Sequence, residues 1–185
     1  MIIDNFLTSY DLLQKTARNN QFEGVVNPAD GVLYPDISVE IPQECIDEVQ
    51  IRLDEAMERP AIINTIFMRL TSENTKGAPH QAHNDLLMGD YTLLLYLQEG
   101  EGGTSFVKHI ETGMDAQPET TEQHDAWVRD TNVPEAWEVT ELVSMKENRA
   151  NIIRSERMHR AEPVNQVGFG SDQTDGRIVL IAFFT

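Results

Sequence analysis

Residues 83 to 106 read HNDLLMGDYTLLLYLQEGEGGTSF and begin with a histidine and an aspartate one residue apart, His83 and Asp85. A strongly apolar run and a double glycine follow. A charged pair at the head of a buried strand costs stability unless something neutralises it. Three explanations are open at this point: a bound metal ion, a hydrogen-bond network, or exposure to solvent at the start of the strand. On an extended segment, side chains at i and i+2 leave the same side, so these two residues could share one ligand.

A third metal-binding side chain would have to come from elsewhere, and ERMHRAEPV offers His159 between two predicted strands. Two histidines and one carboxylate on one face of an octahedral ion leave three positions open. That arrangement suits non-haem Fe(II), which must also bind substrate and oxygen. Arg177 stands at the start of the last strand, GRIVLIAFF. An arginine there can clamp a carboxylate with two parallel hydrogen bonds.

The rest of the chain supplies the elements that would position these side chains. Hydrophobic spacing predicts helices at 8–19 and 42–58, the second with Pro42 in its first turn. β-Branched and aromatic content predicts strands after Pro60. The predicted strands are 61–70, 91–98, 104–109, 137–144, 150–155, 158–167 and 177–185. The run at 91–98 is too apolar to be half exposed and is expected to be a central strand.

This order, helices first and then seven or so short strands, predicts an α+β protein in a single domain, residues 1–185. Residues 1–60 would be a helical support packed on one outer face of a sandwich, jelly roll or barrel formed by residues 61–185. Residues 110–137 form an excursion, expected to be partly helical. With Trp127 and Trp137 it is a candidate lid, or else a surface excursion that its tryptophans pack down.

Composition narrows the possible partners. The formal net charge of −17 makes general attraction to nucleic acid phosphates unlikely. The stretch from 146 to 177 is nevertheless near neutral, which is consistent with a basic rim around an anionic ligand. No run of eighteen apolar residues is present, so no membrane span is expected. The single cysteine, Cys45, rules out an intrachain disulfide, and a reducing cytoplasm is the expected compartment.

The combined pattern resembles the Fe(II)/2-oxoglutarate-dependent dioxygenases, in particular their prolyl 4-hydroxylase-like branch. The matching stretches are HND, YTLLLYLQEGEGGTSF, MHRAEPV and GRIVLIAFF, within residues 60–185. The resemblance implies a double-stranded β-helix (a jelly roll), with His83, Asp85 and His159 as iron ligands. It further implies Arg177 as the partner of the distal 2-oxoglutarate carboxylate and Tyr96 as a hydroxyl assisting there.

The chain departs from the family pattern in two places. Gln98 stands where asparagine is usual, and eighteen residues separate His159 from Arg177, more than is common in the family. The insertion NQVGFGSDQTD accounts for the longer gap. Arg160 and Arg154 are therefore alternative clamps for the cosubstrate.

The three other histidines are not expected to bind the metal. HQAH places His80 three residues before His83, and a role beside the ligands or in substrate binding is expected there rather than ligation. His109 and His124 are expected at the surface or in the lid.

The resemblance implies hydroxylation of an unactivated C–H bond, with Fe(II), 2-oxoglutarate and O2 as cofactor and cosubstrates. A prolyl residue of a protein is the favoured substrate, because the motif match is to that branch. Free amino acids, sugars and small metabolites stay open. One alternative is a cupin-like, metal-binding protein that binds a small molecule or sugar without oxygenase activity, and another is a metal-free structural jelly roll.

Overall fold

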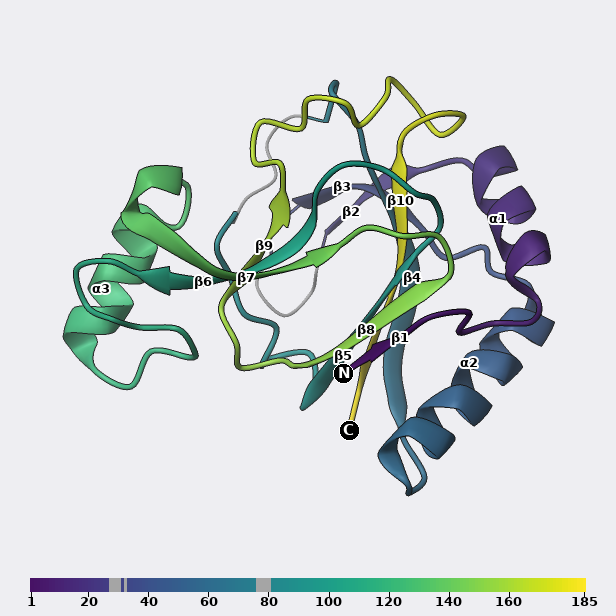
Figure 1. Ribbon diagram of the computed structural model, residues 1–185, viewed down its shortest axis with the longest axis horizontal. Helices are drawn as coiled ribbons and strands as arrows, with labels where there is room; N and C mark the ends of the chain where they lie inside the picture. The colour runs from purple at the N-terminus through teal and green to yellow at the C-terminus, as the bar shows by residue number, and fades with distance from the viewer. Residues whose placement is uncertain (27–30, 32, 76–80) are drawn as a thin grey trace.

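The structure is a computed structural model that describes residues 1–26, 31, 33–75 and 81–185 (Figure 1). Three helices and ten strands alternate along the chain in an order that begins and ends with a strand. The elements are β1 (Ile2–Ile3), α1 (Tyr10–Asn19), β2 (Glu23–Val26), β3 (Leu33–Ser38), α2 (Gln43–Met57), β4 (Ile63–Thr71), β5 (Tyr91–Tyr96), β6 (Gly103–His109), α3 (Thr121–Asp130), β7 (Trp137–Ser144), β8 (Arg149–Arg154), β9 (His159–Glu162) and β10 (Arg177–Phe184), with a 3-10 turn at Pro134–Ala136.

Two sheets form the body of the molecule. The larger has seven strands in the order β1-β8-β5-β10-β4-β3-β2, and the smaller has three in the order β7-β6-β9. All of the pairings are antiparallel. The C-terminal strand β10 lies between β4 and β5 in the larger sheet, and all of its residues except the partly exposed Ile181 are buried.

The outer face of the larger sheet is covered by α1 and α2 (Figure 1). Both helices have one apolar stripe at helical spacing. Leu13 and Ala17 of α1 and Val49 and Leu53 of α2 have no exposed surface. They pack in one core with alternate residues of β4, β5, β8 and β10. The expectation of helices on one outer face is met by this packing.

The inner face of the larger sheet carries the opposite set of side chains. Along β10, Ile178 and Leu180 join the helix-side core, whereas Arg177, Val179 and Ile181 line a cavity on the other side. This alternation follows from the period of two in a strand. The cavity lies between the inner face of the larger sheet and the strand β9 of the smaller one.

Residues 1–60 supply more than the two predicted helices. They also contribute β1, β2 and β3, which extend both edges of the larger sheet. These strands are short or mostly exposed, and one contains a proline. β1 pairs with a distant segment, Ile2 lying opposite Asn151, so local patterning carries little signal for it. β2 pairs with the neighbouring β3, and β3 also pairs with β4.

The double glycine before β6 has a steric reason. Gly102 has φ +84° and Gly103 has φ +144°. A Cβ at Gly102 would collide with the carbonyl oxygen of Glu162, and one at Gly103 with that of Val143. Only glycine allows the chain to enter β6 between β7 and β9 at this point.

The excursion at 110–137 is partly helical, as expected, but it does not cover the cavity. It contains α3 and lies beyond the smaller sheet (Figure 1). Trp137 is buried with Val107 and Met158, and Trp127 packs against the same cluster. None of its residues lines the cavity that the structure describes. The excursion is thus packed down by its tryptophans.

No helix in the described ranges has the length and apolar character needed to span a lipid bilayer.

Candidate metal centre

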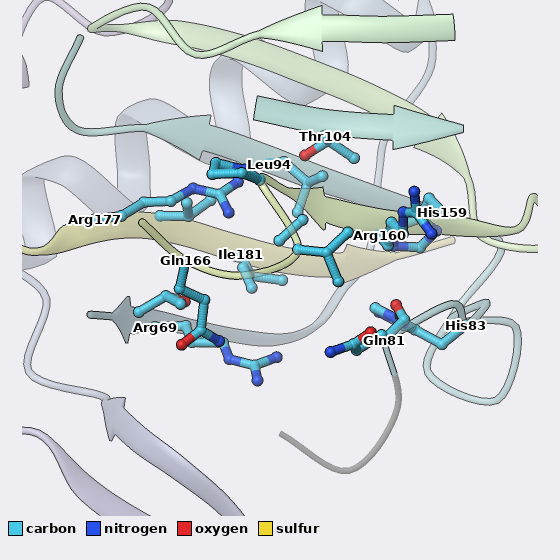
Figure 2. A pocket seen from close by; sticks show the side chains of 15 residues that line it. Arg69, Gln81, His83, Leu94, Thr104, His159, Arg160, Gln166, Arg177 and Ile181 are labelled. Atoms are coloured by element: carbon cyan, nitrogen blue, oxygen red, sulfur yellow. Dashed lines mark hydrogen bonds between the residues drawn. The ribbon is translucent and has the colours of Figure 1, made fainter. Parts of the chain in front are cut away.

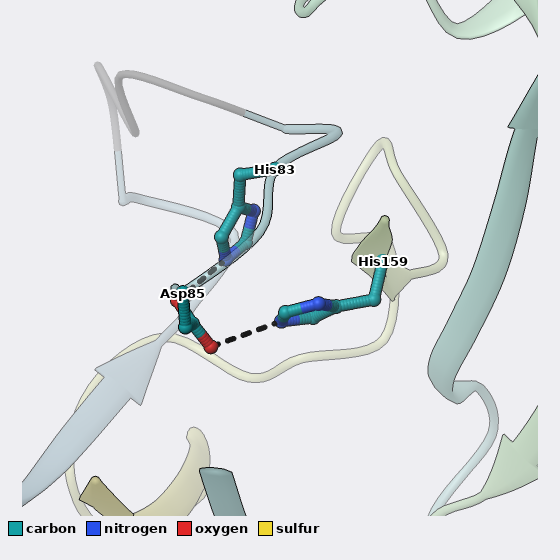
Figure 3. Close-up of side chains that lie close together, drawn as sticks. All are labelled: His83, Asp85 and His159. Carbon is teal, nitrogen blue, oxygen red and sulfur yellow. Dashed lines mark ion pairs between the residues drawn. The ribbon is translucent and has the colours of Figure 1, made fainter. Parts of the chain in front are cut away.

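The structure brings His83, Asp85 and His159 together at the mouth of the two sheets (Figure 3). One potential ligand atom from each lies within 4.8 Å of the other two. The Nε2 of His83 lies 3.7 Å from Oδ1 of Asp85, and the Nε2 of His159 lies 3.3 Å from Oδ2 of the same carboxylate. Three ligand atoms thus converge on one point.

Backbone hydrogen bonds fix the two histidines against each other. His83 and His159 form an isolated antiparallel bridge in which each N–H donates to the other's carbonyl, at 3.0 and 2.8 Å. The Asp85 N–H donates to the carbonyl of Ser155 at 2.8 Å. The segment before β5 is thereby held to the chain between β8 and β9. These main-chain contacts close the loop formed by the 75 residues between the two histidines.

Both imidazoles are oriented in the same way. Nδ1 of His83 is 2.9 Å from the carbonyl oxygen of Gln81, and Nδ1 of His159 is 2.9 Å from that of Arg157. A carbonyl can only accept, so each Nδ1 carries the proton and donates it. Each Nε2 therefore presents a lone pair toward the shared point. Metal-binding histidines commonly donate their other ring N–H to a carbonyl in this way, which fixes the orientation of the ring.

The carboxylate of Asp85 is anchored from behind. Thr92 of β5 donates its hydroxyl to Oδ2 at 3.0 Å, and the Thr92 and Ser155 hydroxyls lie 2.9 Å apart. Thr92 and Ser155 have no exposed surface. Because the hydroxyls hold one carboxylate oxygen, the other is left for a ligand on the side of His83.

The electrostatics of the three residues favour a bound cation. Burial, together with the nearby His159, lowers the pKa of His83 to about 4, so its imidazole is neutral at pH 7. Burial alone would raise the pKa of Asp85, but the adjacent His159 and His83 lower it to about 2. Burial opposes protonation of His159, yet the Asp85 carboxylate raises its pKa overall. His83 and Asp85 are therefore in the protonation states that metals require, whereas a metal that binds His159 must displace a proton from its Nε2.

A cavity of about 120 Å³ lies beside this triad, between the inner face of the larger sheet and β9 (Figure 2). Apolar side chains including Leu94, Val179 and Ile181 form part of its wall. A cavity of about 150 Å³ can bind benzene, so this volume is on the scale of a small organic ligand.

Arg177 lies at the end of the cavity away from His159 in Figure 2. Its side chain is buried, with only 4% of the residue exposed, and burial lowers the pKa of its guanidinium. Nη2 donates to the carbonyl of Gly103 at 3.0 Å, while the buried Nε has no hydrogen-bond partner. No carboxylate of the described residues forms an ion pair with it. A buried cation with unused donors is suited to an anionic ligand.

The insertion before β10 explains the long gap between His159 and Arg177. Its Phe169 is buried and lies 5.1 Å from the Arg177 guanidinium, measured to the ring centroid. The N–H of Arg177 donates to the carbonyl of Phe169 at 3.2 Å. The extra residues place an aromatic ring against the guanidinium. The length of the insertion therefore does not move Arg177 away from the cavity.

Tyr96 packs next to Arg177 without lining the cavity itself. It has no exposed surface, its ring centroid is 5.8 Å from the Arg177 guanidinium, and its hydroxyl donates to Thr104 at 2.8 Å. Thr104 does line the cavity. The unusual Gln98 has a structural role, since its side-chain oxygen accepts from Arg18 and from the Ile178 N–H.

The alternative clamps are both engaged elsewhere. Arg160 forms an ion pair with Glu162 at 2.7 Å and also donates to the carbonyl of Pro134. Arg154 is exposed, pairs with Glu156 at 3.2 Å and does not line the cavity. Arg177 is the one of the three predicted clamps that faces the cavity without an ionic partner.

Of the other histidines, the two in the described residues, His109 and His124, do not belong to the triad. His80 lies outside the described residues. His124 is exposed, as expected. The expectation of a surface or lid position is wrong for His109, which is buried beside Trp137, its Nε2 3.0 Å from Asp130. Its carboxylate partner is 21 residues away in the chain, which its immediate sequence does not reveal.

Two further cavity residues were not foreseen from the sequence. Arg69 of β4 and Gln81 both line the cavity, and each has a buried side-chain atom without a hydrogen-bond partner, Nε and Oε1 respectively. The available signal was the alternation of β4, which places Arg69 and Thr71 on the face opposite Met68 and Leu70.

Solved structures with the same fold include three iron or 2-oxoglutarate proteins at low sequence identity. The non-heme alpha ketoglutarate dependent epimerase SnoN from nogalamycin biosynthesis is 13% identical, with a TM-score of 0.59 over 100% of this chain and 77% of that one. EctD from S. alaskensis with 2-oxoglutarate and 5-hydroxyectoine is 12% identical, with a TM-score of 0.55 over 100% and 71%. HygX from Streptomyces hygroscopicus with iron bound is 12% identical, with a TM-score of 0.51 over 100% and 80%. This likeness confirms the predicted α+β jelly-roll fold.

The chain belongs to a family of unknown function, DUF6445, whose model matches residues 1–184. A search of the curated proteins gave no match.

Proposed function

We propose that this protein is an Fe(II)- and 2-oxoglutarate-dependent oxygenase. His83, Asp85 and His159 would hold the iron, and Arg177 would bind the distal carboxylate of 2-oxoglutarate. The single observation that carries the proposal is that one cavity contains both a converging set of metal-binding atoms and a buried arginine without an anionic partner. The triad presents free Nε2 lone pairs and a carboxylate, and the buried Arg177 presents a cation without an anion.

The donor set fits the proposed metal. Two imidazoles and one carboxylate on one side of an ion leave positions open for a chelating cosubstrate and for oxygen. The Nδ1–carbonyl bonds and the Thr92 hydroxyl hold these ligands in place before any metal arrives. When bound, iron with 2-oxoglutarate and oxygen would supply the oxidising power to attack an unactivated C–H bond.

The protein's own residues would bind, orient and shield. Arg177 fixes one end of the diacid at the closed end of the cavity, with Tyr96 and Phe169 keeping water from the guanidinium. Leu94, Val179 and Ile181 form an apolar wall between that end and the triad. Exclusion of water strengthens the ionic contact and protects reactive species. The remaining opening next to His83 and Gln81 would admit the primary substrate.

The structural neighbours support a small-molecule substrate more than a protein one. The neighbours' descriptions name nogalamycin biosynthesis and 5-hydroxyectoine. A prolyl residue of a protein stays a prediction from motif likeness. The cupin-like alternative would keep the metal and need no clamp, and the buried, unpaired Arg177 speaks for the oxygenase.

The test is an anaerobic titration of the purified protein with Fe(II) and then 2-oxoglutarate, followed by succinate release in air. We expect 2-oxoglutarate to raise the melting temperature only when a divalent metal is present. Asp85→Ala should abolish metal binding and succinate formation while the fold survives. Asp90→Ala, at an exposed aspartate five residues further on, is the matched control. Wild-type turnover in Asp85→Ala would refute the proposal.

A further inference from the structure

The cavity contains a second arginine that the proposed chemistry does not use. Arg69 lies on β4 opposite Val179 of β10, and its side chain lines the cavity with Thr71 and Arg177. In Figure 2 its guanidinium extends to the side of the cavity where Gln81 and His83 lie, while Arg177 lies at the other side. The two cations therefore serve different parts of the same space.

Arg69 has no partner among the described residues. Its Nε is buried without a hydrogen bond. The carboxylates of Asp36 and Asp85 are close enough to act on it electrostatically, but each is engaged elsewhere. Asp36 accepts from Thr75 at 3.0 Å, and Asp85 accepts from Thr92 at the same distance. Neither forms an ion pair with Arg69. A guanidinium kept in this state is costly unless a ligand supplies the anion.

When the formal charges in the cavity are added up, the positive charge of Arg69 has no negative counterpart. If the proposed function holds, the divalent iron and Arg177 together carry three positive charges. Asp85 and the two carboxylates of 2-oxoglutarate carry three negative ones. These groups neutralise one another without Arg69. One positive charge then remains unmatched, in a protein whose formal net charge is −17.

We propose that Arg69 binds a carboxylate of the primary substrate, so that the substrate is a small organic acid. This inference rests on the proposed function and adds the substrate class. Gln81 supports it, because its buried Oε1 lacks a donor on the same side of the cavity. A free amino acid or a hydroxy acid offers both an anion for Arg69 and an N–H or O–H for Gln81. An internal prolyl residue of a protein offers neither.

The experiment compares acids with their neutral amides. Mn(II)-loaded protein, saturated with 2-oxoglutarate under anaerobic conditions, is titrated with the common L-amino acids, L-lactate and L-malate, and with the primary amide of each acid. Binding is followed by ligand-observed NMR and calorimetry. We expect one or more acids to bind, and the corresponding amide to bind at least ten times more weakly. A phosphate monoester, phosphoglycolate, and a blocked prolyl tripeptide are included to separate other substrate classes.

Variants of Arg69 test its part in that preference. Arg69→Gln should weaken the acid by roughly 10- to 100-fold and leave the amide unchanged, which removes the discrimination. Arg69→Lys should retain part of the discrimination between acid and amide. Arg69→Met repeats the test with an apolar side chain. The affinity for 2-oxoglutarate should change by less than about threefold, in contrast to Arg177→Gln. The exposed Arg154→Gln is the control for loss of an arginine.

Several outcomes would overturn the inference. These are binding of none of the acids, equal binding of acid and amide, preference for the phosphate or the blocked peptide, or a loss of 2-oxoglutarate affinity in Arg69→Gln equal to that in Arg177→Gln. The first titration, of 2-oxoglutarate into the metal-loaded protein, reports on the proposed function alone. If that titration fails, the comparison of acid and amide on the metal-loaded protein still decides whether Arg69 selects an anion.

Discussion

Replacement of Arg177 by methionine should separate ligand binding from stability, because the two effects are expected to differ sharply in size. The guanidinium is buried and makes one hydrogen bond, to the Gly103 carbonyl, while Nε has no partner. Methionine has a similar length and removes an unneutralised buried charge, which is favourable. It also leaves the Gly103 carbonyl unsatisfied, which costs about 1–3 kcal/mol. These two effects oppose each other, so the free energy of unfolding without ligands should change by less than about 2 kcal/mol.

The loss of 2-oxoglutarate binding should be larger. Charge-assisted hydrogen bonds to a carboxylate contribute about 1.5–3 kcal/mol each, so loss of the clamp should weaken 2-oxoglutarate by at least about tenfold and up to several hundredfold. Urea unfolding of the metal-free protein gives the first quantity. Calorimetric titration of 2-oxoglutarate into Mn(II)-loaded protein gives the second. Arg177→Lys, which keeps the charge but not the fork geometry, should fall between the wild type and Arg177→Met in affinity.

The opposite pattern would refute this reasoning. If Arg177→Met strongly destabilised the metal-free protein and left the affinity of the folded fraction for 2-oxoglutarate unchanged, Arg177 would be a structural residue. Its contact with Gly103 and the ring of Phe169 would then be its function. The clamp would have to be sought elsewhere in the cavity.

Two further predictions concern the ligands themselves. Thr92→Val should weaken Mn(II) binding by roughly 10-fold, because it removes the hydrogen bond that orients Asp85, and calorimetry with Thr65→Val as an exposed control would check it. His83 has a folded-state pKa of about 4, below its usual 6.5, so the unfolded chain binds the extra proton first. The stability that neutral His83 contributes is present above pH 6.5 and is lost as the pH falls toward 4, by about 3 kcal/mol at most. His83→Gln should reduce this loss in urea unfolding of chelator-treated protein at pH 7 and pH 4.5; an equal loss in both proteins would contradict it.

The order of motifs was enough to predict the fold and the close approach of His83, Asp85 and His159. His83, Asp85 and His159 were recognisable because an H-x-D pair, an apolar strand, a double glycine and a late histidine occur in a fixed sequence. The glycines are informative because backbone atoms of other strands approach them too closely for a side chain. These features are local, so sequence preserves them.

Features that depend on distant pairings could not be predicted in this way. Arg69 reads as a single charged residue near the end of an apolar strand, and only the cavity shows that it lacks a partner. His109 reads as a polar residue beside an acidic excursion, yet Asp130 and Trp137 bury it. The first strand, β1, pairs with β8, which lies near the other end of the chain. Each case is decided by which segments meet in space.

The peptide groups of Ala82, the residue before His83, are held entirely by the excursion. Its carbonyl accepts from the Trp127 indole and the Thr131 hydroxyl, and its N–H donates to the Thr131 carbonyl. A stretch more than forty residues downstream that does not line the cavity thus helps to position one imidazole. If that stretch were shortened, the Ala82 peptide groups would lose these hydrogen-bond partners and would need others. We therefore expect the length of the stretch to be constrained by contacts inside the protein rather than by an external partner.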